Sequence, residues 1–126
     1  KRKQMRYTVE VKNKVTRWFK EGTSELHREN GSAVEYPNGN KYWYLNGKLH
    51  REDGPAIEYP DRSKSWYLNG ELHREDGPAL EYTSGHKEWY LNGKELTQKE
   101  FKVQKQSCSG KIVEIDGKKY ELREVK

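Results

Sequence analysis

Cysteine and long apolar runs are almost absent from this sequence. Its 126 residues contain a single cysteine, Cys108, which excludes an internal disulfide and a cysteine-based metal site. No apolar run is long enough to cross a membrane, and the N-terminal residues lack the apolar segment of a signal peptide. We therefore expect a protein of the reducing cytoplasm, without a membrane span.

Hydrophobic residues are scarce as a class, but aromatic residues are not. Hydrophobic residues make up 31% of the chain and charged residues 36%, a composition that lies near that of disordered proteins. Against disorder, aromatic residues reach 12%, with four tryptophans and nine tyrosines, many of them at regular intervals. A chain of this kind must bury large rings rather than many aliphatic side chains, which favours a thin sheet over a thick core.

The net charge of +5 is unevenly distributed. Residues 1–20 carry eight basic and one acidic side chain, a net charge of +7. Residues 21–96 carry nine basic and fourteen acidic side chains (−5), and residues 97–126 carry eight and five (+3). A mildly acidic segment therefore lies between two basic ends, which argues against a uniformly basic nucleic-acid binder.

Internal repetition dominates the middle of the chain. Trp43, Trp66 and Trp89 are each separated by 23 residues. The same step separates Asn-Gly pairs (46, 69 and 92), Leu-His-Arg-Glu runs (26, 49 and 72), glycines (31, 54 and 77) and Glu-Tyr pairs (35, 58 and 81). Repetition at a fixed period predicts an array of identical structural units.

Each unit is predicted to contain two short strands and two turns. Asn46-Gly47 between extended segments is a strong hairpin signal, because both central residues of a type I′ turn need positive φ. Asp53-Gly54-Pro55 predicts a bend, because proline lacks the backbone N–H that a β-ladder needs and glycine can adopt φ values that other residues avoid. The segments between turns are too short for helices. The expected class is all-β: a single-layer antiparallel array of β-hairpins.

The ends of the chain depart from the repeat. Residues 15–36 look like a degenerate first unit with two inserted residues near Gly22, and Tyr7, Val9 and Val11 predict a leading strand before it. Thr97-Gln98-Lys99-Glu100 fits a capping box, which predicts a short helix over residues 98–106. A closing hairpin is expected over residues 112–122. We accordingly divide the chain into a basic arm with the leading strand (1–14), the repeats (15–96) and a C-terminal cap (97–126), since arrays need atypical ends.

The repeat resembles the MORN repeat. The resemblance lies in Asn46-Gly47-Lys48-Leu49-His50, Gly54 and Tyr59-Pro60-Asp61, and it covers residues 15–96. The run from His50 to Ala56 stands where that family usually has a shorter glycine-containing turn, and this variant resembles repeats of small bacterial and phage proteins, some of them antitoxin-like. The resemblance implies an array of hairpins that serves mostly as a protein-interaction scaffold and sometimes as a lipid-binding one.

The aromatic residues fall into two predicted groups. The four tryptophans are expected to form the core and to stack with Tyr36, Tyr59 and Tyr82. Because neighbouring residues of a strand point to opposite faces, Tyr44, Tyr67 and Tyr90 should form an exposed aromatic row. That row is our first candidate for contact with a partner.

Charged residues complete the candidate partner-binding set. Arg51 and Arg74, with the acidic residues that follow them, predict ion-pair networks around the turns, which contribute little each to stability. Equivalent glutamates lie about 10 Å apart, too wide to imitate successive phosphates. The full candidate set is Tyr44, Tyr67, Tyr90, Arg51, Arg74, Glu58 and Glu81.

The row of His27, His50 and His73 does not predict a metal site. Equivalent residues of successive units lie about 10 Å apart, whereas Zn–N bonds are about 2.0–2.1 Å long. We expect each histidine to donate to a turn carbonyl instead. No metal and no cofactor are predicted.

The sequence carries no enzyme motif. It lacks a glycine-rich phosphate loop, a nucleophile elbow and a His-Glu-x-x-His motif, and a repeat array offers equivalent copies on an open face rather than one pocket. We predict a non-enzymatic protein that binds another protein. By resemblance, it is a phage or mobile-element inhibitor of a bacterial defence protein, such as an anti-CRISPR, or an antitoxin-like partner of a toxin, in the cytoplasm of a bacterial host.

A nucleic-acid-binding accessory protein is the competing interpretation. The basic residues Lys3, Arg6, Lys12, Lys14 and Arg17 are its candidate phosphate contacts, and such contacts give salt-dependent binding. The open edges of an array also allow a homodimer.

Overall fold

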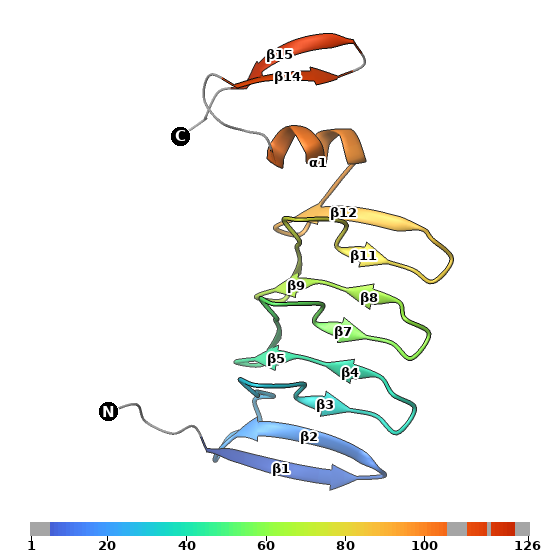
Figure 1. The fold of residues 1–126 in the computed structure, drawn as a ribbon. Coiled ribbons are helices and arrows are strands. Elements are labelled where there is room, and N and C mark those ends of the chain that lie inside the picture. The colour runs from blue at the N-terminus through green and yellow to red at the C-terminus, as the bar shows by residue number, and fades with distance from the viewer. Residues whose placement is uncertain (1–5, 106–110, 116, 123–126) are drawn as a thin grey trace.

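The computed structural model describes residues 6–105, 111–115 and 117–122, and short antiparallel strands dominate it (Figure 1). The strands are β1 (Tyr7–Lys12), β2 (Val15–Lys20), β3 (Val34–Glu35), β4 (Lys41–Tyr42), β5 (Tyr44–Leu45), β6 (Lys48–Leu49), β7 (Ile57–Glu58), β8 (Lys64–Ser65), β9 (Tyr67–Leu68), β10 (Glu71–Leu72), β11 (Leu80–Glu81), β12 (Lys87–Leu91), β13 (Lys94–Leu96), β14 (Lys111–Ile115) and β15 (Lys118–Leu122). Helix α1 (Gln98–Lys105) follows β13. The predicted all-β class, with hairpins and a short C-terminal helix, is confirmed.

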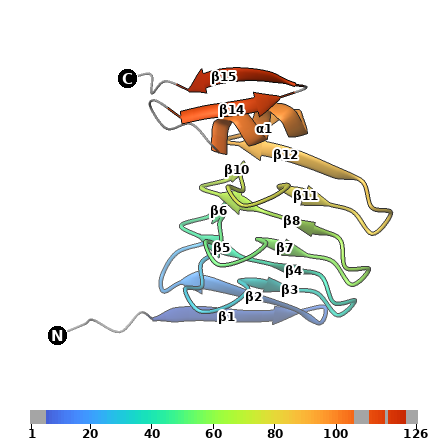
Figure 2. The same cartoon turned by 45° about the horizontal axis from the view of Figure 1, so that its top comes forward.

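A nine-stranded sheet runs through the array. Its strand order is β1-β2-β3-β4-β7-β8-β11-β12-β13, so each central repeat adds two strands to it. The hairpins β5–β6 and β9–β10 lie along one side of this sheet (Figure 2). The array is therefore a stack of rungs, and equivalent side chains of successive repeats recur along the stack.

Tryptophan marks the point where the chain leaves the long sheet for the side hairpin. The backbone N–H of Trp43 donates to the carbonyl of Ala56 at 2.7 Å, while its own carbonyl accepts from the N–H of His50 at 3.0 Å. Trp66 makes the same two bonds, to Ala79 at 2.8 Å and from His73 at 3.0 Å. Each tryptophan thus joins the next rung of the sheet to its own hairpin.

The predicted Asn-Gly turns are confirmed. Asn46 and Gly47 have φ values of 53° and 78°, and the pairs at 69–70 and 92–93 are alike, as a type I′ turn requires. The turns also join successive repeats, since the N–H of Gly47 donates to the carbonyl of Leu26 at 2.9 Å. Asn13 and Lys14 (φ 53° and 65°) close the β1–β2 hairpin in the same way.

The core is thinner than a tryptophan-filled core would be. Ala33, Ala56 and Ala79 are fully buried, and Val34 and Ile57 are nearly so. The four tryptophan side chains are only half-buried. Small residues therefore fill the interior of the sheet, and the prediction that the indole rings are its filling is wrong.

The C-terminal end of the array is covered as predicted. Thr97 and Glu100 form a reciprocal capping box, in which the N–H of Thr97 donates to Glu100 Oε1 at 2.8 Å and the N–H of Glu100 donates to Thr97 Oγ1 at 3.1 Å. Helix α1 packs against β12 and β13, where Leu96 and Phe101 are buried. The closing hairpin is formed by β14 and β15.

Candidate functional site

Strand register gives the nine-stranded sheet two chemically different faces. Glutamate and lysine alternate directly across the strands in the order Glu35, Lys41, Glu58, Lys64, Glu81 and Lys87, and these residues define the charged face. Tyr42 follows Lys41 in β4 and so points to the opposite side. We name that side the tyrosine face, which comprises Tyr36, Tyr42, Tyr44, Tyr59, Tyr67, Tyr82 and Tyr90.

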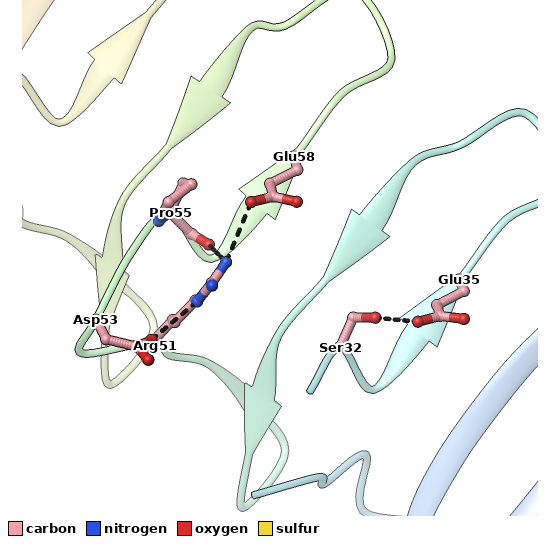
Figure 3. Close-up of polar contacts among 6 residues, drawn as sticks. All are labelled: Ser32, Glu35, Arg51, Asp53, Pro55 and Glu58. Atoms are coloured by element: carbon pink, nitrogen blue, oxygen red, sulfur yellow. Dashed lines mark hydrogen bonds and ion pairs between the residues drawn. The ribbon is translucent and has the colours of Figure 1, made fainter. Parts of the chain in front are cut away.

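On the side of the charged face, one arginine per repeat ties the Asp-Gly-Pro bend to the sheet. The Arg51 guanidinium lies 4.0 Å from the centre of the Trp43 ring. It also donates to Asp53 Oδ1 (3.0 Å), the Pro55 carbonyl (3.1 Å) and Glu58 Oε2 (3.2 Å), as Figure 3 shows. Arg51 is therefore committed to contacts within its own repeat.

The same arrangement recurs in the neighbouring repeats. Arg74 lies 3.8 Å from the Trp66 ring centre and contacts Asp76, Pro78 and Glu81. Arg28 lies 3.8 Å from the Trp18 ring centre and donates to the Ser32 carbonyl. In that first repeat Ser32 bonds to Glu35 (Figure 3), so a hydroxyl shares the role that arginine has elsewhere.

Two groups of predicted partner-binding residues therefore lie on opposite sides of the sheet. Arg51, Arg74, Glu58 and Glu81 belong to the networks of the charged face. Tyr44, Tyr67 and Tyr90 belong to the tyrosine face. One flat partner surface cannot cover both groups at once.

The histidine row links each repeat to the next. His27 Nδ1 accepts from the backbone N–H of Asn46 at 2.8 Å, and His50 and His73 accept equivalently from Asn69 (2.9 Å) and Asn92 (2.8 Å). The prediction that these histidines donate to a turn carbonyl is wrong, because the ring nitrogen faces a backbone donor. An accepting Nδ1 places the proton on Nε2, which in His27 lies 3.5 Å from Glu29.

The tyrosine face brings together two sets of rings that were predicted from the sequence to lie on opposite sides of the sheet. Tyr36 packs edge-on against Tyr42, with ring centres 5.6 Å apart. Burial raises the pKa of Tyr59, and the neighbouring Tyr42, Tyr67 and Tyr82 add to the rise. The predicted stacking of these rings with the tryptophans is therefore wrong: the indoles of repeats one to three face arginine, and the tyrosines face one another.

The predicted row itself lies within this cluster. Tyr44 and Tyr67 are half-buried; burial raises the pKa of each, and neighbouring tyrosines raise both further. Burial also raises the pKa of Tyr90, with Glu95 and Glu88 contributing. Tyr36 and Tyr82 are more open, at 38% and 44% exposure. The face therefore presents protonated hydroxyls and ring surface to solvent.

One position changes the shape of this face from repeat to repeat. Tyr42, Ser65 and Glu88 stand 23 residues apart at equivalent places in the sheet. Because Ser65 is small, an open groove of about 430 Å³ lies beside it. The groove is lined by Tyr59, Tyr67, Leu72, Leu80 and Tyr82, and by Asp61, Ser63, Lys64, Ser65 and Glu81. We call this the tyrosine groove.

Hydroxyl contacts fix one rim of the tyrosine groove. The N–H of Thr83 donates to Ser63 Oγ at 3.1 Å, the two side-chain hydroxyls lie 3.2 Å apart, and Thr83 Oγ1 donates to the Asp61 carbonyl. Two successive turns are thereby held together. The aromatic walls are consequently preorganised, which lowers the ordering cost of binding.

The opposite side of the array also has hollows, but their polar groups are largely engaged internally. Trp43, Leu45 and His50 line one hollow of about 620 Å³, and Trp66, Leu68 and His73 line an equivalent one of about 550 Å³. Arg51 borders both and is bound to Asp53 and Glu58. These hollows follow from the packing of successive bends.

The candidate nucleic-acid contacts form no single patch. Arg6, Lys12 and Lys14 are exposed, the last two beside the β1–β2 turn. Arg17 lies 3.6 Å from Glu10 on the partner strand. Lys3 lies outside the described residues.

Two further features bear on function. No group of three or more histidine, cysteine or acidic side chains within the described ranges is arranged to hold a metal ion. In the same part of the chain, α1 is too short and too polar to be a membrane-spanning helix.

Comparisons with protein-family models, with curated proteins and with solved structures find no match. The candidate site therefore rests on the geometry of the chain itself.

Several residues of the tyrosine groove were not predicted from the sequence. Tyr59 and Tyr82 were expected on the same side as the tryptophans, and no role was predicted for Ser65. The substitution pattern at positions 42, 65 and 88 was visible in the aligned repeats and marks where the groove opens. The side to which Tyr59 points was not visible, because it follows from the path of the chain through a turn.

Proposed function

We propose that this chain is a non-enzymatic binding protein that holds another protein on its tyrosine face, with the tyrosine groove as the anchor point. One observation carries the proposal: seven tyrosines from several rungs, two exposed and five partly buried, gather on one side of a sheet around a groove with two leucines in its lining. Tyrosine supplies large contact area and a hydroxyl at low conformational cost, which is why it is enriched in protein interfaces.

The charged face offers less to a partner. Its glutamates alternate with lysines across the strands, and its arginines are bound within their own repeats. Partner contacts there would have to displace existing ion pairs. On the tyrosine face, a partner replaces water over rings and hydroxyls.

A variant series tests this assignment. Tyr82→Ala removes an exposed ring of the groove, and Tyr67→Ala removes a half-buried one. We expect each to lower capture of the protein partner from a lysate of the source cells by about tenfold or more, as for an interface hot spot. Pull-down followed by mass spectrometry measures the capture, and circular dichroism checks the fold of each variant.

The matched control lies on the charged face. Lys41→Ala removes an exposed side chain beside Tyr42, and capture should be unchanged. The proposal fails if Lys41→Ala lowers capture as much as Tyr82→Ala does, or if both tyrosine variants capture as well as the wild type.

Nucleic-acid binding through Arg6, Lys12, Lys14 and Arg17 stays a prediction from the sequence. The same pull-down with and without nuclease, at two salt concentrations, separates the two functions. Loss of the captured material on nuclease treatment contradicts the protein-partner proposal. The phage, anti-CRISPR and antitoxin-like roles likewise stay predictions from the resemblance.

A further inference from the structure

The spacing of the tyrosine rows limits what can lie along them. Equivalent tyrosines such as Tyr59 and Tyr82, which follow β7 and β11, are separated by two strands of the sheet, which is about 9.6 Å at a strand spacing of about 4.8 Å. A polyproline II helix repeats every three residues, or about 9.3 Å. An extended β-strand presents one side every two residues, at about 6.6 Å, and so falls out of step with the rows. An α-helix brings residues seven apart to about 10.5 Å, a poorer match that worsens along the array.

The chemistry of the face points to the same conformation. A polyproline II chain has no internal hydrogen bonds, so its carbonyls need donors from the surface that binds it. The hydroxyls of Tyr59 and Tyr67 can supply them, since a phenol is protonated at neutral pH and burial raises the pKa of both side chains further. The aromatic walls of the tyrosine groove offer the flat apolar surface on which proline rings pack.

Charge selects the residues between the prolines. Asp61 and Lys64 line the groove, where Glu81 is already paired with Arg74. Farther along the face, Glu88 and Glu95 lie near Tyr90, and Glu88 accepts from the Tyr90 hydroxyl at 3.4 Å. Residues 21–96 as a whole carry a net charge of −5. A basic segment therefore complements this part of the molecule.

We infer that the tyrosine face binds a basic, proline-rich segment in the polyproline II conformation, with prolines three residues apart on successive tyrosine rows and one proline in the tyrosine groove. The inference rests on the proposed function and names its partner class. The segment runs across the strands, along the stack of rungs in Figure 1.

A synthetic peptide of about twelve residues, long enough to span the rows at about 3.1 Å per residue, tests the inference by fluorescence anisotropy. The probe has proline at every third position and lysine or serine between. A permuted peptide has the same composition with its prolines clustered, and an acidic peptide has glutamate in place of lysine. We expect the probe to bind about tenfold or more tightly than either, with an affinity that falls as salt rises.

Two substitutions at one position sharpen the test. Ser65→Tyr introduces the residue that the preceding repeat carries as Tyr42, fills the groove and should lower probe affinity about tenfold or more. Ser65→Ala removes the hydroxyl that bonds to Tyr59 without filling the groove and should leave most of the affinity. Thermal melts establish that both variants are folded.

The outcomes separate this inference from the proposed function. Equal affinity for the probe and the permuted peptide, no binding of the probe by the wild type, or an unchanged affinity in Ser65→Tyr overturns the inference. If tyrosine-dependent capture of a protein partner persists in any of these cases, the proposed function stands. If that capture is also lost, both are rejected.

Discussion

At the scale of single residues, the arginine and the histidine that recur in each repeat have bonding partners that explain their type. Arg51 needs both a planar face for Trp43 and several donors for Asp53, the Pro55 carbonyl and Glu58. Lysine has the charge but not the planar fork, so it could not replace these contacts. His50 offers an acceptor at Nδ1 to the next Asn-Gly turn, which a lysine or arginine lacks.

One residue of the array stands in an unfavourable backbone conformation. Arg62 has a φ of 76°, and the equivalent positions in the neighbouring repeats are Gly39 and Gly85, with φ of 102° and 94°. A non-glycine side chain in this backbone region costs the folded state about 1–2 kcal/mol. Replacing it by glycine removes this strain, but the greater conformational entropy of glycine in the unfolded chain offsets part of the gain. Arg62→Gly should therefore raise the free energy of unfolding by about 0.5–1 kcal/mol, measured by urea denaturation.

The converse substitution provides the control. Gly85→Ala places a side chain in the same backbone region, where no atom would obstruct its Cβ. It should destabilise by a similar amount. Stabilisation by Gly85→Ala, or destabilisation by Arg62→Gly, would contradict the backbone explanation.

At the scale of elements, α1 depends on its capping box. The backbone N–H of Thr97 holds the pKa of the Glu100 carboxyl below its ordinary value. A lowered folded-state pKa means that the ionised carboxylate stabilises the fold above the ordinary glutamate pKa, and that this contribution is lost as the pH falls through the lowered value. The helix should therefore fray on acidification, which amide hydrogen exchange over residues 98–105 can follow.

Two variants isolate this contribution. Thr97→Ala removes the side-chain acceptor for the N–H of Glu100 and should destabilise by about 1 kcal/mol. Glu100→Gln keeps a capping acceptor without a titratable group, so its hydrogen exchange should lose the acid dependence while the helix persists. An unchanged acid dependence in Glu100→Gln would assign the effect to another group.

Elements with a local chemical signature were predictable from the sequence. The Asn46-Gly47 turn and the Thr97–Glu100 box each specify their own geometry within a few residues. The roles of His50 and Arg51 were not predictable in the same way. Their partners, Asn69 and Trp43, are known only once the order of the rungs is known, and strand alternation cannot be carried through the turns that separate Tyr59 from Trp66.

At the scale of the whole molecule, the contacts described above join a repeat to its immediate neighbours. Deleting residues 44–66 joins Trp43 to Tyr67 and recreates the Trp-Tyr step of the array. Contacts such as that between His27 and the next Asn-Gly turn can then form with Asn69. We expect this shortened chain to fold cooperatively with a lower melting temperature, because it loses one unit and one inter-unit interface.

A deletion out of register is the matched control. Removing residues 44–55 deletes the β5–β6 hairpin and joins Trp43 directly to Ala56, so no turn is left between the antiparallel strands β4 and β7. This variant should be unfolded by circular dichroism. If both deletions melt alike, the stack is not built of exchangeable units.

The charged face and the tyrosine face also show why composition misleads for this molecule. A chain with few aliphatic residues folds because Ala33, Ala56 and Ala79 allow close approach of the strands, while arginine and tyrosine side chains cover the two surfaces. The repeat could be predicted from the sequence. Which residues lie between the strands and which cover each surface could not, because this depends on the pairing of strands that are distant in sequence.

The place occupied by Tyr42, Ser65 and Glu88 has a further consequence. The backbone bonds of the tryptophans and the bonds from each histidine to the next Asn-Gly turn do not involve its side chain, so the residue type there can change while these bonds remain. The ring of Tyr42 fills the surface at this position, the small side chain of Ser65 leaves a groove, and the carboxylate of Glu88 adds a negative charge. Substitution at this one position of a repeat would therefore change the binding preference of that rung and leave the other rungs unaltered.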